Sequence, residues 1–231
     1  MTFSVAGLCP RTGEIGLALA TSSMAAGARA LRLGLAGAVF AQARSDPRLT
    51  ARALASLEAG HTAQQALDDL LTVPHAEFRQ FGILDNAGRT AHSTGGRCLP
   101  PKGAATAHGA LALGNGLAND AVVPAILEGF QADPGAPLAG RLLHALDQGL
   151  VVGGEPYPLR SAALQVVRPG IPFPVIDLRI DLHDTPLTAL RHLWTYYAPL
   201  LEGYLARALD PEHAPLAASF EGHLRNPVQG P

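Results

Sequence analysis

The sequence has few aromatic residues and no excess of charge of either sign. Aromatic side chains make up 5% of its 231 residues, whereas hydrophobic residues together make up 48%. A core of this composition must be built from aliphatic and small side chains. The 17 lysine and arginine residues nearly balance the 19 aspartate and glutamate residues, and the formal net charge is −2. Because nucleic acids and anionic membranes attract basic proteins, we expect neither of them as a partner.

Cysteines and metal-binding motifs are also scarce. The only two cysteines, Cys9 and Cys98, exclude a disulfide framework, although a single bridge between them stays open. We expect both to be reduced and buried. The nine histidines form no HxxxH or HxH pair beside a carboxylate, and there is no CxxC pair. We therefore expect no metal site and no cofactor.

Segments that predict a membrane span, a secretory signal or a serine nucleophile elbow are absent from the sequence as well. No apolar run reaches the ~18 residues that a membrane helix needs. The N-terminus has no basic region followed by an apolar helix, so we expect a cytoplasmic protein. A GxSxG motif, which would place a serine on a sharp strand-to-helix turn, does not occur.

What the sequence does contain is a succession of apolar strands and amphipathic helices. Two apolar runs joined by a turn over 10–13 predict a hairpin, and the segment 81–94 predicts another. Asp46 and Pro47 predict a helix start, as does Thr62. These helices are expected over 47–60 and 61–71, further strands over 37–43, 108–115, 161–170 and 173–183, and further helices over 119–130, 136–150 and 186–209.

The order of these elements predicts the fold class. It fits neither a strict alternation of strand and helix nor an all-β protein. Strands that are apolar on both faces are expected where two sheets pack face to face with helices outside each. We predict one α+β domain over 1–209, closed by the helix over 186–209, and a poorly ordered, proline-rich tail over 210–231. Aromatic residues on that last helix favour packing or a homodimer surface: Trp194, Tyr196 and Tyr197.

The amino end raises the question of catalysis. A small residue after Met1 permits removal of the initiator methionine, which leaves Thr2 with a hydroxyl and a free α-amine. An α-amine has a pKa of ~7.7–8.0, so part of it is neutral at pH 7 and able to take a proton. Threonine with its own N-terminal amine is a known nucleophile and base pair. The plainer interpretation is a strand that is simply docked early, beginning at Phe3.

Several motifs together resemble a family of proteins termed DUF1028, placed in the Ntn-hydrolase (N-terminal nucleophile) superfamily. The segments that carry the resemblance, in chain order, are MTFSVAGLCPRTGEIGLALATSSMAAGA, GAVFAQAR, QFGILDNAGRTAHSTGGRC, ALGNGLANDAVVPAI, RSAALQVVR and IDLRIDLH. The resemblance implies a four-layer αββα sandwich of two antiparallel sheets, which agrees with the element order. It also implies that Thr2 is the N-terminal threonine typical of the family's opening.

The resemblance extends to further site residues. Where relatives carry a lysine after the second strand, this chain has Ser22 and Ser23, and either hydroxyl is expected to hydrogen-bond the amine or to cap the strand end. Asn115 matches the family's Gly-Asn step, so it either donates to a tetrahedral oxyanion or belongs to a tight turn. Thr94 and Gly95 match a Thr-Gly step whose amides are expected to line the pocket.

A second group of candidates lies beyond residue 150. Relatives read GGDxRGRQSAA where this chain reads GGEPYPLRSAA, which contains Glu155, Arg160 and Ser161. Arg160 is expected either to bind a substrate carboxylate or to pair with Glu155. Asp177 interrupts an apolar strand and either binds substrate or forms a solvated charge row with Arg179.

Two functions follow from these patterns. The first is an amidohydrolase in which Thr2 attacks a small amide or peptide-like bond and its own amine moves the proton. The second is a protein that binds a small molecule or a cell-wall fragment without catalysis, because a fold does not imply a function.

Overall fold

The computed structural model describes residues 1–222. The chain divides into two compact units, Met1–Leu190 and a second that begins at Arg191. The division falls inside the helix that was predicted over 186–209. From the sequence, a single domain over 1–209 was expected. Part of the predicted tail, 223–231, lies outside the described residues.

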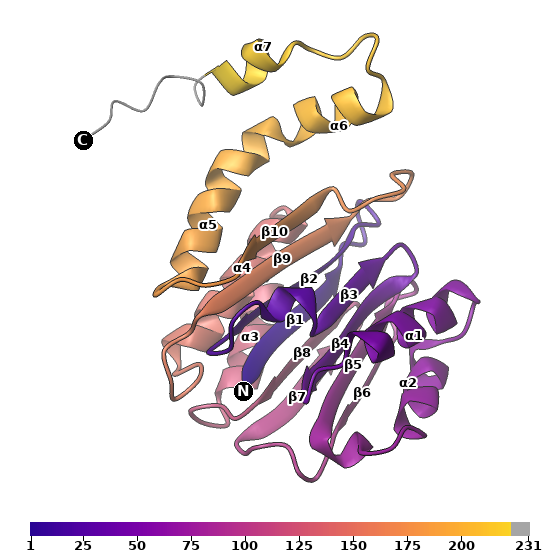
Figure 1. Ribbon diagram of the computed structural model, residues 1–231, viewed down its shortest axis with the longest axis vertical. Coiled ribbons are helices and arrows are strands. Elements are labelled where there is room, and N and C mark those ends of the chain that lie inside the picture. Colours follow the sequence, from indigo (N-terminus) through magenta and orange to yellow (C-terminus); the bar gives the residue numbers. More distant parts are fainter. Residues whose placement is uncertain (223–231) are drawn as a thin grey trace. The chain divides into compact units, whose positions relative to one another are not determined.

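The first unit contains a six-stranded antiparallel sheet in the order β10-β9-β2-β1-β8-β7. β1 occupies an interior position, between its hairpin partner β2 and the distant β8 (Figure 1). The hairpin turns over 10–13 as predicted. The strands are β1 (Thr2–Leu8), β2 (Ile15–Thr21), β7 (Lys102–Ala107), β8 (Ala110–Asn115), β9 (Ser161–Val167) and β10 (Ile176–Ile180).

A four-stranded antiparallel sheet packs against the first one. Its order is β3-β4-β5-β6, with β3 (Leu31–Gly34), β4 (Gly37–Ala43), β5 (Arg79–Asp85) and β6 (Thr90–Thr94). Aliphatic side chains fill the interface, including Leu17, Leu19 and Leu113. The sheets approach closely at Gly82, where a Cβ atom would lie 2.7 Å from Leu113 Cδ2. This core contains few large rings, as the low aromatic content requires.

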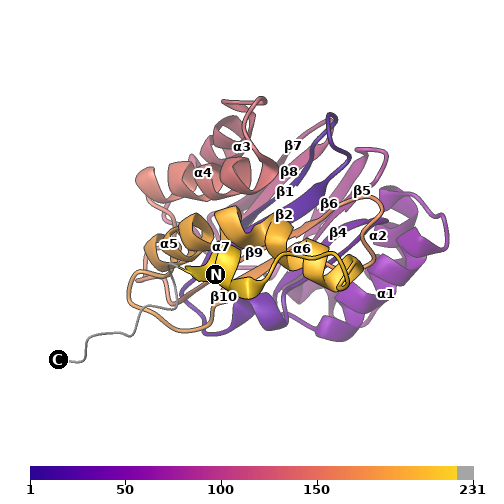
Figure 2. The same cartoon turned by 90° about the horizontal axis from the view of Figure 1, so that it is seen from above.

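Helices cover the outer faces of both sheets (Figure 2). α1 (Pro47–Glu58) and α2 (Ala63–Leu71) pack on the four-stranded sheet. α3 (Val122–Gln131) and α4 (Leu138–Val151) pack on the six-stranded sheet. The prediction of a mixed helix-and-sheet fold with two antiparallel sheets is therefore confirmed.

Local sequence signals explain where the first two helices begin. The Asp46 carboxylate accepts a hydrogen bond from the amide of Arg48 at 3.0 Å, and Pro47 occupies the first turn. The Arg48 side chain, with help from Arg79, lowers the pKa of Asp46 to about 2. Thr62 and Gln65 form a reciprocal capping box at the start of α2. Both predicted helix starts are confirmed.

Three differences from the predicted elements have physical causes. The sequence did not predict β3 or β7, short edge strands that hydrogen-bond on one side only and carry no long apolar alternation. The last helix is interrupted, because Pro199 has no N–H to donate. Its parts are α5 (Pro186–Tyr197), a 3₁₀ turn (Ala198–Leu200) and α6 (Leu201–Leu209), and a short helix α7 (Ala217–Glu221) follows.

The aromatic residues of the second unit contact one another. Tyr197 stacks on Tyr204 with ring centroids 5.7 Å apart, and Tyr204 meets the edge of Phe220 at 5.4 Å. Tyr196 is exposed. A homodimer through this helix stays a prediction. None of the helices in 1–222 is both long and apolar enough to span a membrane.

Candidate functional site

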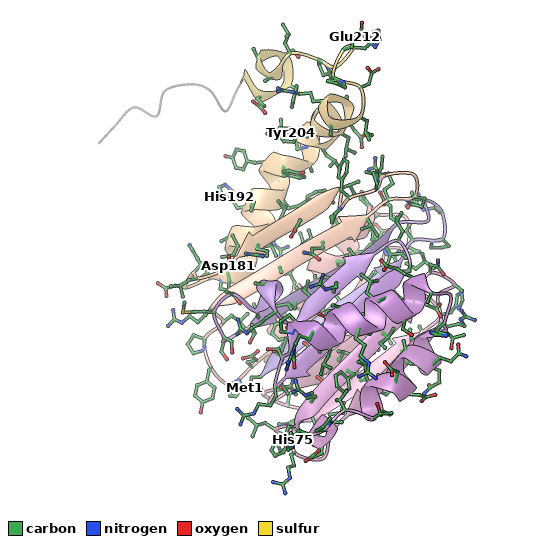
Figure 3. All side chains as sticks on the ribbon, turned by 45° about the vertical axis from the view of Figure 1, so that its right-hand side comes forward. Met1, His75, Asp181, His192, Tyr204 and Glu212 are labelled. Carbon is green, nitrogen blue, oxygen red and sulfur yellow. The ribbon has the colours of Figure 1, made fainter. Side chains whose placement is uncertain are left out.

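Thr2 is the first residue of β1 and is 6% exposed. It pairs with Asn115 at the end of β8. Since the register of the first hairpin pairs Phe3 with Ala20, its continuation brings Thr21 opposite Thr2. Figure 3 labels Met1, the residue that precedes the strand. Thr2 is thus held by an interior strand of the sheet.

Two hydroxyl groups bind the carbonyl of Met1. The Thr21 hydroxyl donates to this oxygen at 2.8 Å, and the Thr2 hydroxyl also donates to it. Thr21 Oγ1 in turn accepts from the amide of Ser23 at 3.1 Å. The Met1 carbonyl carbon is bonded to the Thr2 nitrogen, so the Thr21 hydroxyl lies close to that nitrogen. From the sequence, the hydroxyl of Ser22 or Ser23 was expected in this position.

Glu155 is a buried carboxylate next to this end of the chain. Its Oε2 accepts from the amide of Ser22 at 3.0 Å, whereas its buried Oε1 has no hydrogen-bond partner. Burial raises the pKa of Glu155, although hydrogen bonds from Ser22 and Thr21 and the positive charge of the N-terminus act in the opposite direction. A buried carboxylate with a spare acceptor is suited to hold a positively charged amine.

Replacing Glu155 by glutamine is expected to stabilise the fold near neutral pH. Because the folded-state pKa is raised, the stability that this side chain gives is present below its ordinary value of 4.5 and is lost as the pH rises through the folded-state pKa. The variant should therefore unfold at a higher temperature than wild type near pH 8 and at the same temperature below pH 4. Thermal unfolding followed by circular dichroism measures this.

The matched control for this prediction is Glu128→Gln, because Glu128 is exposed on α3. It should leave the unfolding temperature unchanged at both pH values. A Glu155→Gln variant that melts below wild type near pH 8 would show that the ionised carboxylate stabilises the fold, contrary to the burial argument.

A buried amide network connects the two sheets behind Thr2. The amide group of Gln80, which is fully buried, donates to the hydroxyl of Thr94 at 2.9 Å and to the carbonyl of Gly114 at 2.9 Å. Its carbonyl accepts from Asn115 Nδ2 at 3.0 Å. Gln42 Nε2 donates to the hydroxyl of Ser4 at 3.0 Å. The hydrogen bond to Gln80 therefore fixes the side chain of Asn115. This bond uses only one of the two amide hydrogens of Asn115.

The alternative interpretation of the Gly-Asn-Gly step, a tight turn, is also partly correct. Gly116 has φ +62°, and a Cβ atom there would lie 2.2 Å from Cγ of Met1. Asn115 itself is the last residue of β8. The step therefore both turns the chain and lets Met1 approach it closely.

Lys102 was not among the predicted residues, although it is the only lysine in the sequence. It pairs with Asn115 across β7 and β8. Its ammonium group donates to the carbonyls of Gly95, Gly96 and Cys98 at 2.8, 2.9 and 3.0 Å. All three ammonium hydrogens are thereby used, so Lys102 holds the loop after β6. Its isolation in the sequence was the one signal that could have identified it.

A cavity of about 350 Å³ lies beside the N-terminus. Its lining residues are Met1, Ala43, Arg44, Phe78, Arg97, Cys98, Leu99 and Asn115. Thr94 and Gly95, which were expected in its wall, bind Gln80 and Lys102 instead. A larger cavity of about 640 Å³ is lined by Leu33, Ile171 and others near the far end of the sheets, away from Thr2.

The other predicted site residues lie apart from Thr2. The side chain of Arg160 pairs with Asp184 and not with Glu155. The Ser161 hydroxyl donates to the carbonyl of Ser23 at 2.7 Å, so it supports the loop after β2. Asp177 is exposed and accepts from Gln165 Nε2 at 2.9 Å, which matches the solvated interpretation.

The titratable groups form no cluster of three or more metal-binding side chains within 1–222. Cys9 and Cys98 are free and buried. Among the described residues that line the cavity, Cys98 carries the one thiol, and none carries a hydroxyl. Burial raises the pKa of that thiol and disfavours the reactive thiolate.

Comparison with known proteins identifies the family of this chain. The family described as "Family of unknown function (DUF1028)" matches residues 2–190. The chain belongs to this family. The match begins at the buried threonine and ends where the first compact unit ends. The DUF1028 match thus covers every residue of the site described above except Met1.

Two solved structures are similar to this DUF1028 protein. Protein SPO2555 from Silicibacter pomeroyi, of the same family, is 33% identical with a TM-score of 0.79; the match covers 85% of this chain and 89% of that one. Anbu (ancestral beta-subunit) from Yersinia bercovieri is 12% identical with a TM-score of 0.39, over 93% of this chain and 99% of that one. None of the curated proteins searched matches.

Proposed function

We propose that this protein is an N-terminal-nucleophile amidohydrolase that acts on a small amide or peptide-like bond, with Thr2 as the nucleophile after removal of Met1. We also propose that its two sheets and outer helices are the αββα sandwich of that superfamily. The observation that carries the proposal is the buried position of Thr2, between Thr21 and Asn115 and directly after Met1, since Met1 and Asn115 both line a cavity. An ordinary strand end needs no such surroundings.

The reaction would run in two halves. Thr2 Oγ1 attacks the amide carbon while the α-amine takes its proton, and collapse of the tetrahedral intermediate breaks the C–N bond as the ammonium protonates the leaving amine. Water then attacks the resulting ester with the amine again as base. The acid product leaves, and the Thr2 hydroxyl recovers its proton.

The surrounding residues stabilise the charges that develop during this reaction. The Thr21 hydroxyl and Glu155 hold the α-amine, since both lie at the N-terminus and Glu155 Oε1 has no partner. Asn115 keeps one amide hydrogen that Gln80 does not use, and we assign it to the developing oxyanion. Donors of this kind are worth ~3 kcal/mol in other acyl-transfer enzymes.

The state of the Met1–Thr2 bond tests the proposal. One preparation should retain Met1, and the other should be released from a fusion by a protease that leaves Thr2 first, with both checked by intact mass. Only the second is expected to hydrolyse members of a panel of small amides, because only it has a free α-amine next to the hydroxyl. Equal rates for the two would overturn the assignment of the amine as base.

One observation favours the second candidate, a binding protein without catalysis. The only lysine, Lys102, donates its three ammonium hydrogens to backbone carbonyls. No lysine is therefore available to lower the pKa of the Thr2 hydroxyl and α-amine. The preparation that begins at Thr2 is called the Thr2-first protein below. If it binds a ligand without turnover, that result would favour this candidate.

A further inference from the structure

The cavity beside Met1 is positively charged. Arg44 follows the last residue of β4 and Arg97 lies in the loop after β6, and both contribute to its wall. No acidic side chain within residues 1–222 lines it. Both arginines are exposed, so their guanidinium groups are accessible to a ligand. Two such groups on a small concave surface attract an anion.

The nearest carboxylates in the sequence already have other partners. Asp46 binds Arg48 at 2.8 Å and lies 3.7 Å from Arg79. Glu77 lies 4.0 Å from the ring of His75. Among the residues described, neither Arg44 nor Arg97 forms an ion pair. Their charges are therefore not balanced by the protein itself.

The backbone positions both arginines at the cavity. Ala43, which also lines it, has φ +67°, a conformation that is strained for a non-glycine residue and tends to occur at functional sites. The carbonyl of Arg44 accepts from Arg79 Nη1 at 2.6 Å. Arg97 stacks over the ring of Phe78, with 5.1 Å between Cζ and the ring centroid.

We infer that the substrate is an amide that carries a carboxylate close to the scissile bond, and that Arg44 and Arg97 bind this carboxylate. The inference rests on the proposed function. Guanidinium groups match the two oxygens of a carboxylate. The cavity of about 350 Å³ admits only a small molecule. An N-acyl amino acid has the required chemistry, and Phe78 and Leu99 offer an apolar surface to its side chain.

Matched substrates test the role of the charge. The Thr2-first protein should be given a panel of N-acetyl amino acids and the same compounds as C-terminal primary amides. We expect kcat/KM to be about 10- to 100-fold higher for the acids, the range of a charge-assisted hydrogen bond. The double variant Arg44→Gln/Arg97→Gln should bring the ratio close to one, whereas Arg32→Gln, on β3 and outside the cavity wall, should preserve it. A wild-type ratio near one overturns the inference and leaves the proposed function standing.

Binding to the Thr2→Ala variant separates the two proposals. Calorimetric titration should show binding of the N-acetyl amino acids, weak binding of their amides, and loss of this difference in the triple variant that also carries both arginine changes. That result supports the inference even if wild type hydrolyses nothing, an outcome that overturns the proposed function alone. Equal binding of acids and amides, or no binding, overturns the inference. Inorganic phosphate that binds as tightly as the acids overturns the assignment to a carboxylate.

Discussion

Replacing Thr2 by alanine is expected to reduce kcat/KM for amide hydrolysis by at least about a thousandfold, because the change removes the attacking oxygen and leaves the amine without a nucleophile to activate. The variant should remain folded. Among the described residues, the Thr2 hydroxyl bonds only to the carbonyl of Met1, which is absent once position 2 is first, so its loss leaves no other buried group without a partner. Initial rates on the amide panel, with intact mass to confirm that position 2 is first, measure the effect.

Thr2→Ser is the matched variant, because it keeps both a hydroxyl and an α-amine. It should retain measurable activity, within about 100-fold of wild type. Unchanged turnover in Thr2→Ala would show that another residue attacks the amide. An unfolding temperature well below that of wild type would instead assign Thr2 a structural role.

Replacing Gln80 by methionine is expected to lower the free energy of unfolding by about 3–5 kcal/mol. Methionine has nearly the same length, so the change removes the amide without opening a large cavity. Asn115 Nδ2 and the carbonyl of Gly114 would each lose a buried partner. The release of Asn115 should also lower kcat for any amide that the wild type hydrolyses. Urea denaturation at pH 7 measures the stability.

Gln165→Met provides the comparison for this change. Gln165 is half-buried on β9, and its amide donates to Asp177 at the surface. Its replacement should change the free energy of unfolding by less than about 0.5 kcal/mol, because water replaces the lost bond. Equal losses in the two variants would mean that the network at Gln80 contributes no more than an exposed hydrogen bond.

Much of the fold follows from local sequence. The turn over 10–13, the cap formed by Asp46 and Pro47, and the capping box begun by Thr62 each act within a few residues. Strands that are apolar on both faces require cover on both sides, which is why two stacked sheets could be predicted. The edge strands β3 and β7 could not, because they carry no long apolar alternation, although each pairs with the next strand along the chain.

The candidate site was only partly predictable, because its residues come from segments that are distant in sequence. Thr2, Asn115 and Glu155 were identified from their motifs, and the structure brings all three to the amino end. Thr21 was overlooked in favour of Ser22, although its place in the hairpin register puts it opposite Thr2. Arg160 was expected to bind a substrate carboxylate, but its side chain pairs with Asp184. The arginines that line the cavity are Arg44 and Arg97.

Residue type and short-range spacing were enough to predict most of the elements and their order, the family resemblance and the reactive potential of Thr2. The surroundings of that threonine, in contrast, depend on how the chain folds in three dimensions. Thr21, Gln80, Asn115, Glu155 and the two cavity arginines come from separate elements. Their convergence depends on the pairing of β1 with β8 and on the packing of the two sheets, which are long-range contacts that no local pattern encodes.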